Sequence, residues 1–228
     1  MKAKSPSPIA NRAEARREQI LEAALEVFSE KGYHEAGIAD IAGKLNIGHG
    51  TCYRYFKNKL DILHAIVDRI LFGMIEVVRN ESPEKSNTLE EYRRQILNIG
   101  EKFFLLFGND PRLGKIVFFD AMGLDEAIQR KVRLGIDKSA KLTELYLKNG
   151  VSKEFLRKDL DTRIASQAIN AMMFEGIRIS VSSGKDPKFA RRWMEEMPKL
   201  MLEGMKKIKY RTNVFSSGTS SQFWQFLI

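Results

Sequence analysis

The chain contains little cysteine and little histidine. Its 228 residues include one cysteine, Cys52, and three histidines, His34, His49 and His64. A single cysteine allows neither an intramolecular disulfide nor a cysteine-cluster zinc site, which is typical of proteins from a reducing compartment. The histidines show no His-x-x-x-His spacing, and no Walker-type phosphate loop is present. The sequence therefore predicts no metal site and no cofactor, and it favours a binding protein over an enzyme.

Long apolar runs are also missing. No window of about 18 uninterrupted apolar residues occurs, so we expect no transmembrane helix and no stable membrane association. The N-terminal segment 1–8 lacks the apolar stretch of a secretory signal. On these grounds we expect a cytoplasmic protein.

Proline and glycine are sparse as well. Most of the 6 prolines and 16 glycines fall between segments that have helical periodicity, and strand-like alternation is scarce. This pattern predicts an all-α fold. The net charge of +9 favours a polyanionic partner without establishing one, because many basic proteins bind no nucleic acid.

Segment 38–59 carries the strongest functional signal. Its first half has apolar residues at helical spacing, Asn46 tolerates the left-handed backbone of a tight turn, and Ile47 is placed to fill the gap between two helices. A second short helix follows, and it bears aromatic and basic residues. This layout is typical of a DNA-reading helix-turn-helix, whose second helix enters the major groove. The apolar positions are Ile38, Ile41, Ala42 and Leu45.

Candidate DNA contacts gather around this second helix. Arg54 could bind guanine through two hydrogen bonds or could hold a phosphate, while Lys59 adds its charge to a helix N-terminus, which is a favourable phosphate site. We interpret Phe56 as a core residue. For Cys52 two interpretations remain open, a small buried side chain or a redox switch. The candidate contacts are Lys44, Gly48, His49, Gly50, Thr51, Tyr53, Arg54, Tyr55 and Lys59.

The remainder of the chain reads as a larger helical body. We expect a disordered basic arm over 1–11, a helix-turn-helix domain over 12–58, a ligand-binding and dimerisation bundle over 59–210, and a flexible tail with an apolar end over 211–228. The Asp110-Pro111 pair predicts a helix start, since proline is favoured at the first helical position.

Aromatic and methionine side chains in the body are candidates for the lining of a ligand cavity. Methionine repacks readily, so such a mixture suits a hydrophobic or amphipathic, acyl-like ligand, although a solid core is the alternative. Asp120, Glu175 and Arg178 lie within these apolar runs, where we expect them to pair with one another or to hold a ligand head group. The candidate pocket residues are Phe103, Phe104, Phe107, Phe118, Phe119, Met122, Met172, Met173, Phe174 and Arg178.

A stripe of large apolar residues runs along the last predicted helix, 187–208. It is too apolar for a solvent-exposed face, so it either packs inside the chain or forms half of a two-fold interface. We favour the interface, because helix-turn-helix proteins usually read two half-sites. Its members, with one residue of the preceding helix, are Ile177, Trp193, Met194, Met197, Met201 and Met205.

The first sixty residues resemble the TetR-like (TetR/AcrR) family of bacterial transcriptional regulators. The matching elements are segments 20–24, 32–33, 40–42, 50–51 and 53–56, together with Phe28 and Lys59. The resemblance implies a homodimer that binds double-stranded operator DNA and whose body binds a small effector. Gly37, Gly48 and Cys52 depart from the family pattern, in which hydroxyl residues and a leucine are usual.

These observations together predict an N-terminal three-helix DNA-binding head and a C-terminal helical ligand-binding and dimerisation bundle. We expect a repressor that a ligand releases from its operator. The alternative is a helical ligand- or partner-binding protein that lacks sequence-specific DNA binding.

Overall fold

The computed structural model describes residues 8–79, 81–120, 123–182 and 187–207. Within these ranges the chain is almost entirely helical, and the sole β-type contact is an isolated bridge between Leu156 and Lys206. The prediction of an all-α fold is therefore confirmed. The tail expected at 211–228, like the first seven residues of the expected arm, lies outside the described residues.

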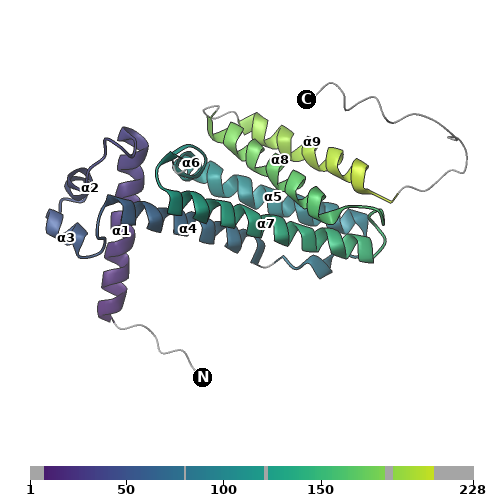
Figure 1. The fold of residues 1–228 in the computed structure, drawn as a ribbon, viewed down its shortest axis with the longest axis horizontal. Helices are drawn as coiled ribbons and strands as arrows, with labels where there is room; N and C mark the ends of the chain where they lie inside the picture. Colours follow the sequence, from purple (N-terminus) through teal and green to yellow (C-terminus); the bar gives the residue numbers. More distant parts are fainter. Residues whose placement is uncertain (1–7, 80, 121–122, 183–186, 208–228) are drawn as a thin grey trace, which may run out of the picture.

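A small head of three helices lies at one end of the molecule, and a fourth helix runs from it into the body (Figure 1). The first helix begins at Pro8 rather than at Arg12, so residues 8–11 are helical and do not belong to a disordered arm. It is followed by Gly32, whose φ of +80° suits the residue that ends a helix. The four helices are α1 (Pro8–Lys31), α2 (Ile38–Lys44), α3 (His49–Tyr53) and α4 (Lys59–Arg79).

The body is an elongated bundle in which α4 lies beside the later helices (Figure 1). The predicted helix start at Pro111 is confirmed: the short helix α6 (Pro111–Lys115) begins there, and a π-helical turn follows it. Asp110 caps this helix, because its side chain accepts a hydrogen bond from Arg112 N. The body elements are η1 (Pro83–Lys85), α5 (Leu89–Asn109), α6 (Pro111–Lys115), η2 (Ile116–Asp120), α7 (Glu126–Ser152), α8 (Thr162–Ser182) and α9 (Pro187–Met205).

Two clusters of buried side chains hold the fold together. The larger one is continuous from Phe28 and Phe56 in the head to Phe107 and Ile177 in the body. A second, smaller cluster surrounds Tyr92 at the beginning of α5. Because the head and the adjacent part of the body share one core, a displacement of α4 or α6 is transmitted to the packing of the head.

Candidate functional site

The turn between α2 and α3 has the predicted geometry. Asn46 adopts a φ of +52°, in the left-handed region that asparagine tolerates better than most residues. Ile47 N donates to the carbonyl of Ala42 at 3.0 Å, and the side chain of Ile47 packs against the core. This closed turn fixes the direction in which α3 leaves the head.

The short helix α3 has one buried face and one exposed face. Cys52 and Phe56 are fully buried, as expected for Phe56, and both belong to the larger core cluster that also contains residues of α1 and α4. His49, Gly50, Tyr53 and Arg54 are exposed, whereas Thr51 and Tyr55 are half-buried. The exposed face therefore presents four of the predicted base-reading and backbone-contact residues to solvent.

Gly48 and Gly50 are not required by the packing of the protein. A Cβ atom added at either position would meet no atom within 4 Å, and neither residue has a positive φ. Gly48 nevertheless serves as the N-terminal cap of α3 with an extended backbone. A glycine that the fold does not need, on the exposed face of a reading helix, leaves room for a close backbone approach by a ligand.

Two predicted phosphate contacts are engaged inside the protein. Lys59 Nζ donates to the carbonyls of Tyr33 at 2.7 Å, His34 at 3.0 Å and Ala36 at 2.8 Å, which uses all three ammonium protons. These bonds disfavour the predicted phosphate site at Lys59, because its ammonium group holds the α1–α2 turn to the start of α4.

Lys44 is likewise occupied. Its ammonium group forms ion pairs with Glu26 and with Glu30 of α1, the latter at 3.3 Å, and the hydrogen bond to Glu26 raises its pKa. A phosphate would have to compete with two carboxylates for this lysine. Of the nine predicted DNA contacts, those on and next to α3 remain available.

Cys52 behaves as a small core side chain. Its thiol is inaccessible, and burial raises its pKa above the ordinary value. A reactive thiol needs exposure and a lowered pKa, so the environment of Cys52 opposes a redox switch.

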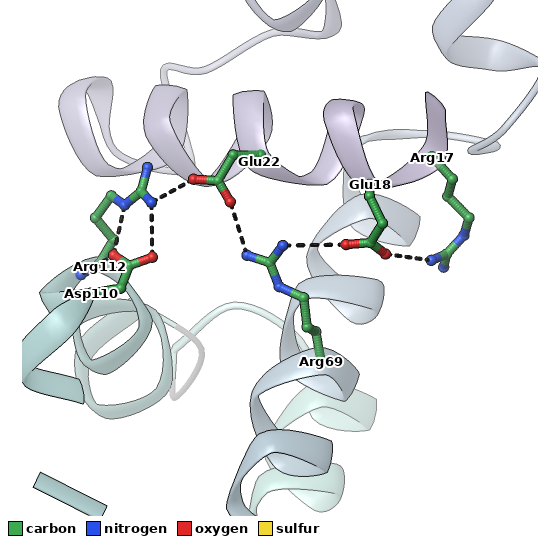
Figure 2. A network of polar contacts seen from close by, with 6 residues as sticks. All are labelled: Arg17, Glu18, Glu22, Arg69, Asp110 and Arg112. Atoms are coloured by element: carbon green, nitrogen blue, oxygen red, sulfur yellow. Dashed lines mark hydrogen bonds and ion pairs between the residues drawn. The ribbon is translucent and has the colours of Figure 1, made fainter. Parts of the chain in front are cut away.

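Ion pairs connect the head to the body (Figure 2). Glu22 of α1 accepts from Arg112 Nη2 at 2.5 Å and from Arg69 Nη2 at 3.4 Å, so one carboxylate bridges α6 and α4. Arg112 also binds Asp110 through two hydrogen bonds of 2.7 and 2.8 Å, which together with Glu22 raise its pKa. This network, which the sequence did not predict, connects α1 to α4, which runs into the body, and to α6 of the body itself.

The body encloses a cavity of about 600 Å³ between α4, α5, α7, α8 and α9. Most of its lining is aliphatic, aromatic or methionine, and Asp68, Lys131 and Lys138 are the charged lining residues. Pockets for small ligands usually have this volume and this mixture of many apolar and few polar groups.

The predicted pocket residues divide into two groups. Phe103, Phe104, Met172 and Met173 line the cavity, whereas Met122 lies outside the described residues. The remaining predicted residues do not line it: they are Phe107, Phe118, Phe119, Phe174 and Arg178.

The predicted residues that do not line the cavity have side chains that point elsewhere. Phe107 and Phe174 are buried and stack on Phe118, so these three rings form solid core. Phe119 is exposed. Arg178 pairs with Glu175 at 2.6 Å on the outer face of α8, so these two charges pair with each other, as one of our expectations had it, and do not reach a ligand.

The apolar stripe of α9 faces inward, which favours the alternative of packing inside the chain over the predicted dimer interface. Trp193, Met194, Met197 and Met201 line the cavity. Met205 and Ile177 are buried in the two core clusters.

Two glycines on the opposing helices allow this arrangement. A Cβ atom at Gly100 would lie 2.6 Å from Met194 Cε, and one at Gly176 would clash with the Trp193 ring. The sequence signal for the inward orientation was thus a glycine in α5 and another in α8. Neither glycine predicts this orientation until the α9 side chain that packs against it is known.

Comparison with known proteins identifies the head. Residues 20–66 match the model of the bacterial regulatory proteins of the tetR family, a range that contains α2, α3 and the beginning of α4. By this domain the chain belongs to the TetR family. It is a DNA-binding transcriptional regulator with a helix-turn-helix.

The sequence similarity to known regulators extends beyond the head into the body. It is 28% identical over 151 residues to the fatty acid metabolism regulator protein of Bacillus subtilis (strain 168), a match that covers 66% of this chain and 76% of that protein. It is 26% identical over 122 residues to the transcriptional activator FasR of Mycolicibacterium smegmatis, and this match covers 54% of each.

Solved structures share the fold. The fatty acid degradation regulator FadR from Bacillus halodurans superposes with a TM-score of 0.71 at 22% identity, covering 88% of this chain and 98% of that one. FadR from Bacillus subtilis in complex with stearoyl-CoA gives a TM-score of 0.67 at 23% identity, covering 82% and 98%. Among the described residues of our TetR-family chain, no helix has the length and apolar character needed to cross a membrane.

Proposed function

We propose that this TetR-family regulator binds a palindromic operator as a homodimer and, as a repressor, releases it when a long-chain acyl ligand with an anionic head group fills the body cavity. The cavity itself is the observation that carries the ligand class, because it is apolar along its walls and has two lysines among its lining residues. The names of the similar regulators of fatty acid metabolism, and the stearoyl-CoA bound to one similar fold, support the same class.

The lysines are placed to receive the head group. Lys131 Nζ donates to Asp68 Oδ2 at 2.9 Å, and both side chains remain partly exposed. Lys138 lies two turns further along α7 and is also exposed. An anionic head group would compete with Asp68 for Lys131, and an exposed pair of this kind holds its partners only weakly.

The head supplies the DNA contacts of the proposed function. Arg54 and Tyr53 are exposed beside Gly50, so they can reach base edges while the backbone of α3 approaches the DNA. Two heads of a dimer would contact half-sites about 34–36 Å apart or a multiple of that distance. A ligand that favours a different separation of the heads lowers operator affinity. Since bacterial operators lie in the cytoplasm, we place the protein there.

The outer faces of α8 and α9 are our proposed dimer interface. Ile164 and Leu200 project from them and are among the most exposed large apolar side chains of the described residues. The substitution Leu200→Glu should convert a dimer to a monomer in analytical ultracentrifugation, while Leu145→Glu on α7 should not. A wild-type monomer at micromolar concentration would overturn the interface.

Fluorescence polarisation tests the regulator directly. The protein is titrated into a labelled duplex from upstream of its own gene and into a scrambled duplex, over a salt series, with and without stearoyl-CoA. We expect tighter binding to the native duplex, a steep loss with salt and release by stearoyl-CoA. Equal, weak binding to both duplexes would favour the alternative, a helical ligand- or partner-binding protein without sequence-specific DNA binding.

A matched pair of variants tests the head-group site. Lys131→Gln should weaken stearoyl-CoA binding several-fold in calorimetry and should raise the concentration needed for release. Lys148→Gln is the control, because Lys148 lies on the same helix, pairs with Glu144 at 2.8 Å and does not line the cavity. Equal ligand affinity in both variants would contradict a role for Lys131.

A further inference from the structure

The cavity is long and has distinct ends. One face of α7 lines it from Lys131 to Tyr146, and the rise of an α-helix places these two residues about 22 Å apart along the axis. Phe72 and Leu134 line it near the lysine end but are 61% and 53% exposed, so the cavity opens to solvent there. Tyr146, at the other end, is buried in the smaller core cluster. The lining therefore runs from an exposed end near Lys131 to a buried end at Tyr146, which we call the closed end.

The polar groups along the cavity wall are satisfied within the protein. Ser139 Oγ donates to Asn170 Oδ1 at 2.7 Å, and Asn170 Nδ2 donates to Thr143 Oγ1 at 2.9 Å. At the closed end the Tyr146 hydroxyl donates to the carbonyl of Glu81 at 2.5 Å. Because these polar groups already have hydrogen-bond partners within the protein, they need none from the ligand. The middle of the cavity therefore suits an unsubstituted alkyl chain.

Tyr92 is different. It lines the closed end next to Tyr146 and is only 2% exposed, yet its hydroxyl forms no hydrogen bond with any described residue. Its ring packs against Phe155 with 5.7 Å between centroids, which fixes the side chain. Burial raises the pKa of Tyr92 far above its ordinary value, so the group remains a protonated donor at any physiological pH. Among the described residues, Asp120 Oδ2 is the fully buried side-chain polar atom without a partner, so the Tyr92 hydroxyl keeps access to the cavity that Tyr92 lines. A ligand that fills the cavity without bonding this hydroxyl would leave it unpaired, and that loss is costly.

We propose that the Tyr92 hydroxyl donates a hydrogen bond to a neutral oxygen, a hydroxyl or a keto group, near the far end of the ligand's chain. The inference rests on the proposed function, in which the anionic head group lies at Lys131 and the chain enters the cavity. It makes the preferred effector a long-chain acyl compound with an oxygen at or beside its terminal carbon. A charged carboxylate at that end is disfavoured, because no cationic residue lines the closed end.

The expected selectivity follows from the cost of an unmade hydrogen bond. A plain alkyl chain buries the Tyr92 hydroxyl against methylene groups, whereas a terminal oxygen completes its bonding. Sites that are built to hydrogen-bond a ligand oxygen discriminate against the analogue that lacks it. A single neutral hydrogen bond of about 1.4 kcal/mol corresponds to a tenfold difference in affinity.

The experiment compares stearoyl-CoA with the same thioester carrying a hydroxyl group on the terminal carbon or on the carbon before it. Calorimetry on the full chain measures both affinities for wild type, Tyr92→Phe and Tyr146→Phe. We expect wild type to prefer a hydroxylated thioester about tenfold, and we expect Tyr92→Phe to lose this preference while binding stearoyl-CoA at least as well. Tyr146→Phe should keep the preference, because its hydroxyl is already bonded to Glu81.

Two results would overturn the inference and leave the acyl-binding cavity intact: equal affinity of wild type for all thioesters, or a preference that survives Tyr92→Phe. Failure of every thioester to bind would refute the proposed acyl cavity itself, and this inference with it. Because the wild-type comparison needs no mutation, a folding defect in a variant cannot hide the answer.

Discussion

The Glu22 carboxylate on α1 accepts a hydrogen bond of 2.5 Å from Arg112 of α6, although 90 residues separate the two in the chain. The same carboxylate accepts from Arg69 of α4 at 3.4 Å (Figure 2). Of these two helices, α4 runs from the head into the body and α6 belongs to the body, and α4 lines the cavity with Asp68 and Phe72. A change of the cavity that moves α4 relative to α6 must therefore alter the position of α1, and with it the reading helix.

The first prediction tests this connection. The substitution Glu22→Gln should leave ligand affinity unchanged and should reduce the ratio of operator dissociation constants measured with and without ligand. The carboxylate is half exposed, so its loss should change the free energy of unfolding by no more than about 1 kcal/mol. Polarisation titrations at fixed salt measure the ratio. Glu175→Gln, which removes an exposed ion pair with Arg178 on α8, is the control, and an equal ratio in the two variants would refute the connection.

A second prediction concerns Gly50. Nothing in the protein contacts a side chain at this position, and alanine is more favourable than glycine within a helix by about 1 kcal/mol. Gly50→Ala should therefore keep or raise the melting temperature and should weaken operator binding at least tenfold if the backbone approaches DNA. Gly108→Ala on α5, which is equally unobstructed, should leave operator binding unchanged. Wild-type affinity in Gly50→Ala would show that α3 does not approach DNA through this residue.

A third prediction concerns Lys59. Because its ammonium group donates to three backbone carbonyls, Lys59→Met should lower the free energy of unfolding by about 2 kcal/mol or more. Urea denaturation measures this loss. Lys57→Met removes a neighbouring exposed charge and should cost little stability. If instead Lys59→Met kept full stability and lost only DNA affinity, Lys59 would be a phosphate contact after all.

A fourth prediction concerns Asp120 in the π-helical turn η2. Its Oδ2 atom is buried and has no hydrogen-bond partner among the described residues. Burial raises its pKa above 3.8, against the opposing positive charge of Lys115 and His34. A carboxyl group with a raised folded-state pKa binds its proton more tightly in the folded state, so stability falls as the pH rises through that pKa.

Asp120→Asn should therefore stabilise the protein at a pH above the raised pKa of Asp120, because the neutral amide brings no charge into the buried site. The gain should vanish below the unfolded-state pKa of 3.8, where Asp120 is protonated in both states. Urea titrations at neutral and acidic pH give the two differences in unfolding free energy. A gain in unfolding free energy that did not depend on pH would mean that the charge of Asp120 does not destabilise the folded protein.

The local features of the head could be predicted from residues that are close together in the chain. Helical spacing of Ile41 and Ala42, a residue at position 46 that tolerates positive φ, and the aromatic Phe56 were enough to predict the helix-turn-helix and its core, because these signals act within a few residues of one another. The exposed residues of α3 followed from the same periodicity.

Only the tertiary structure decided which side chains are free to act. Lys59 reads as a phosphate site until the carbonyls of Tyr33 and Ala36 are found around its ammonium group. The methionine stripe of α9 reads as an interface until Gly100 and Gly176 admit Met194 and Trp193. In both cases the partners lie far away in the chain. The type of a side chain, apolar or charged, does not identify the residue that it will contact in the folded protein. That pairing is set by how the helices pack, which local sequence pattern does not encode.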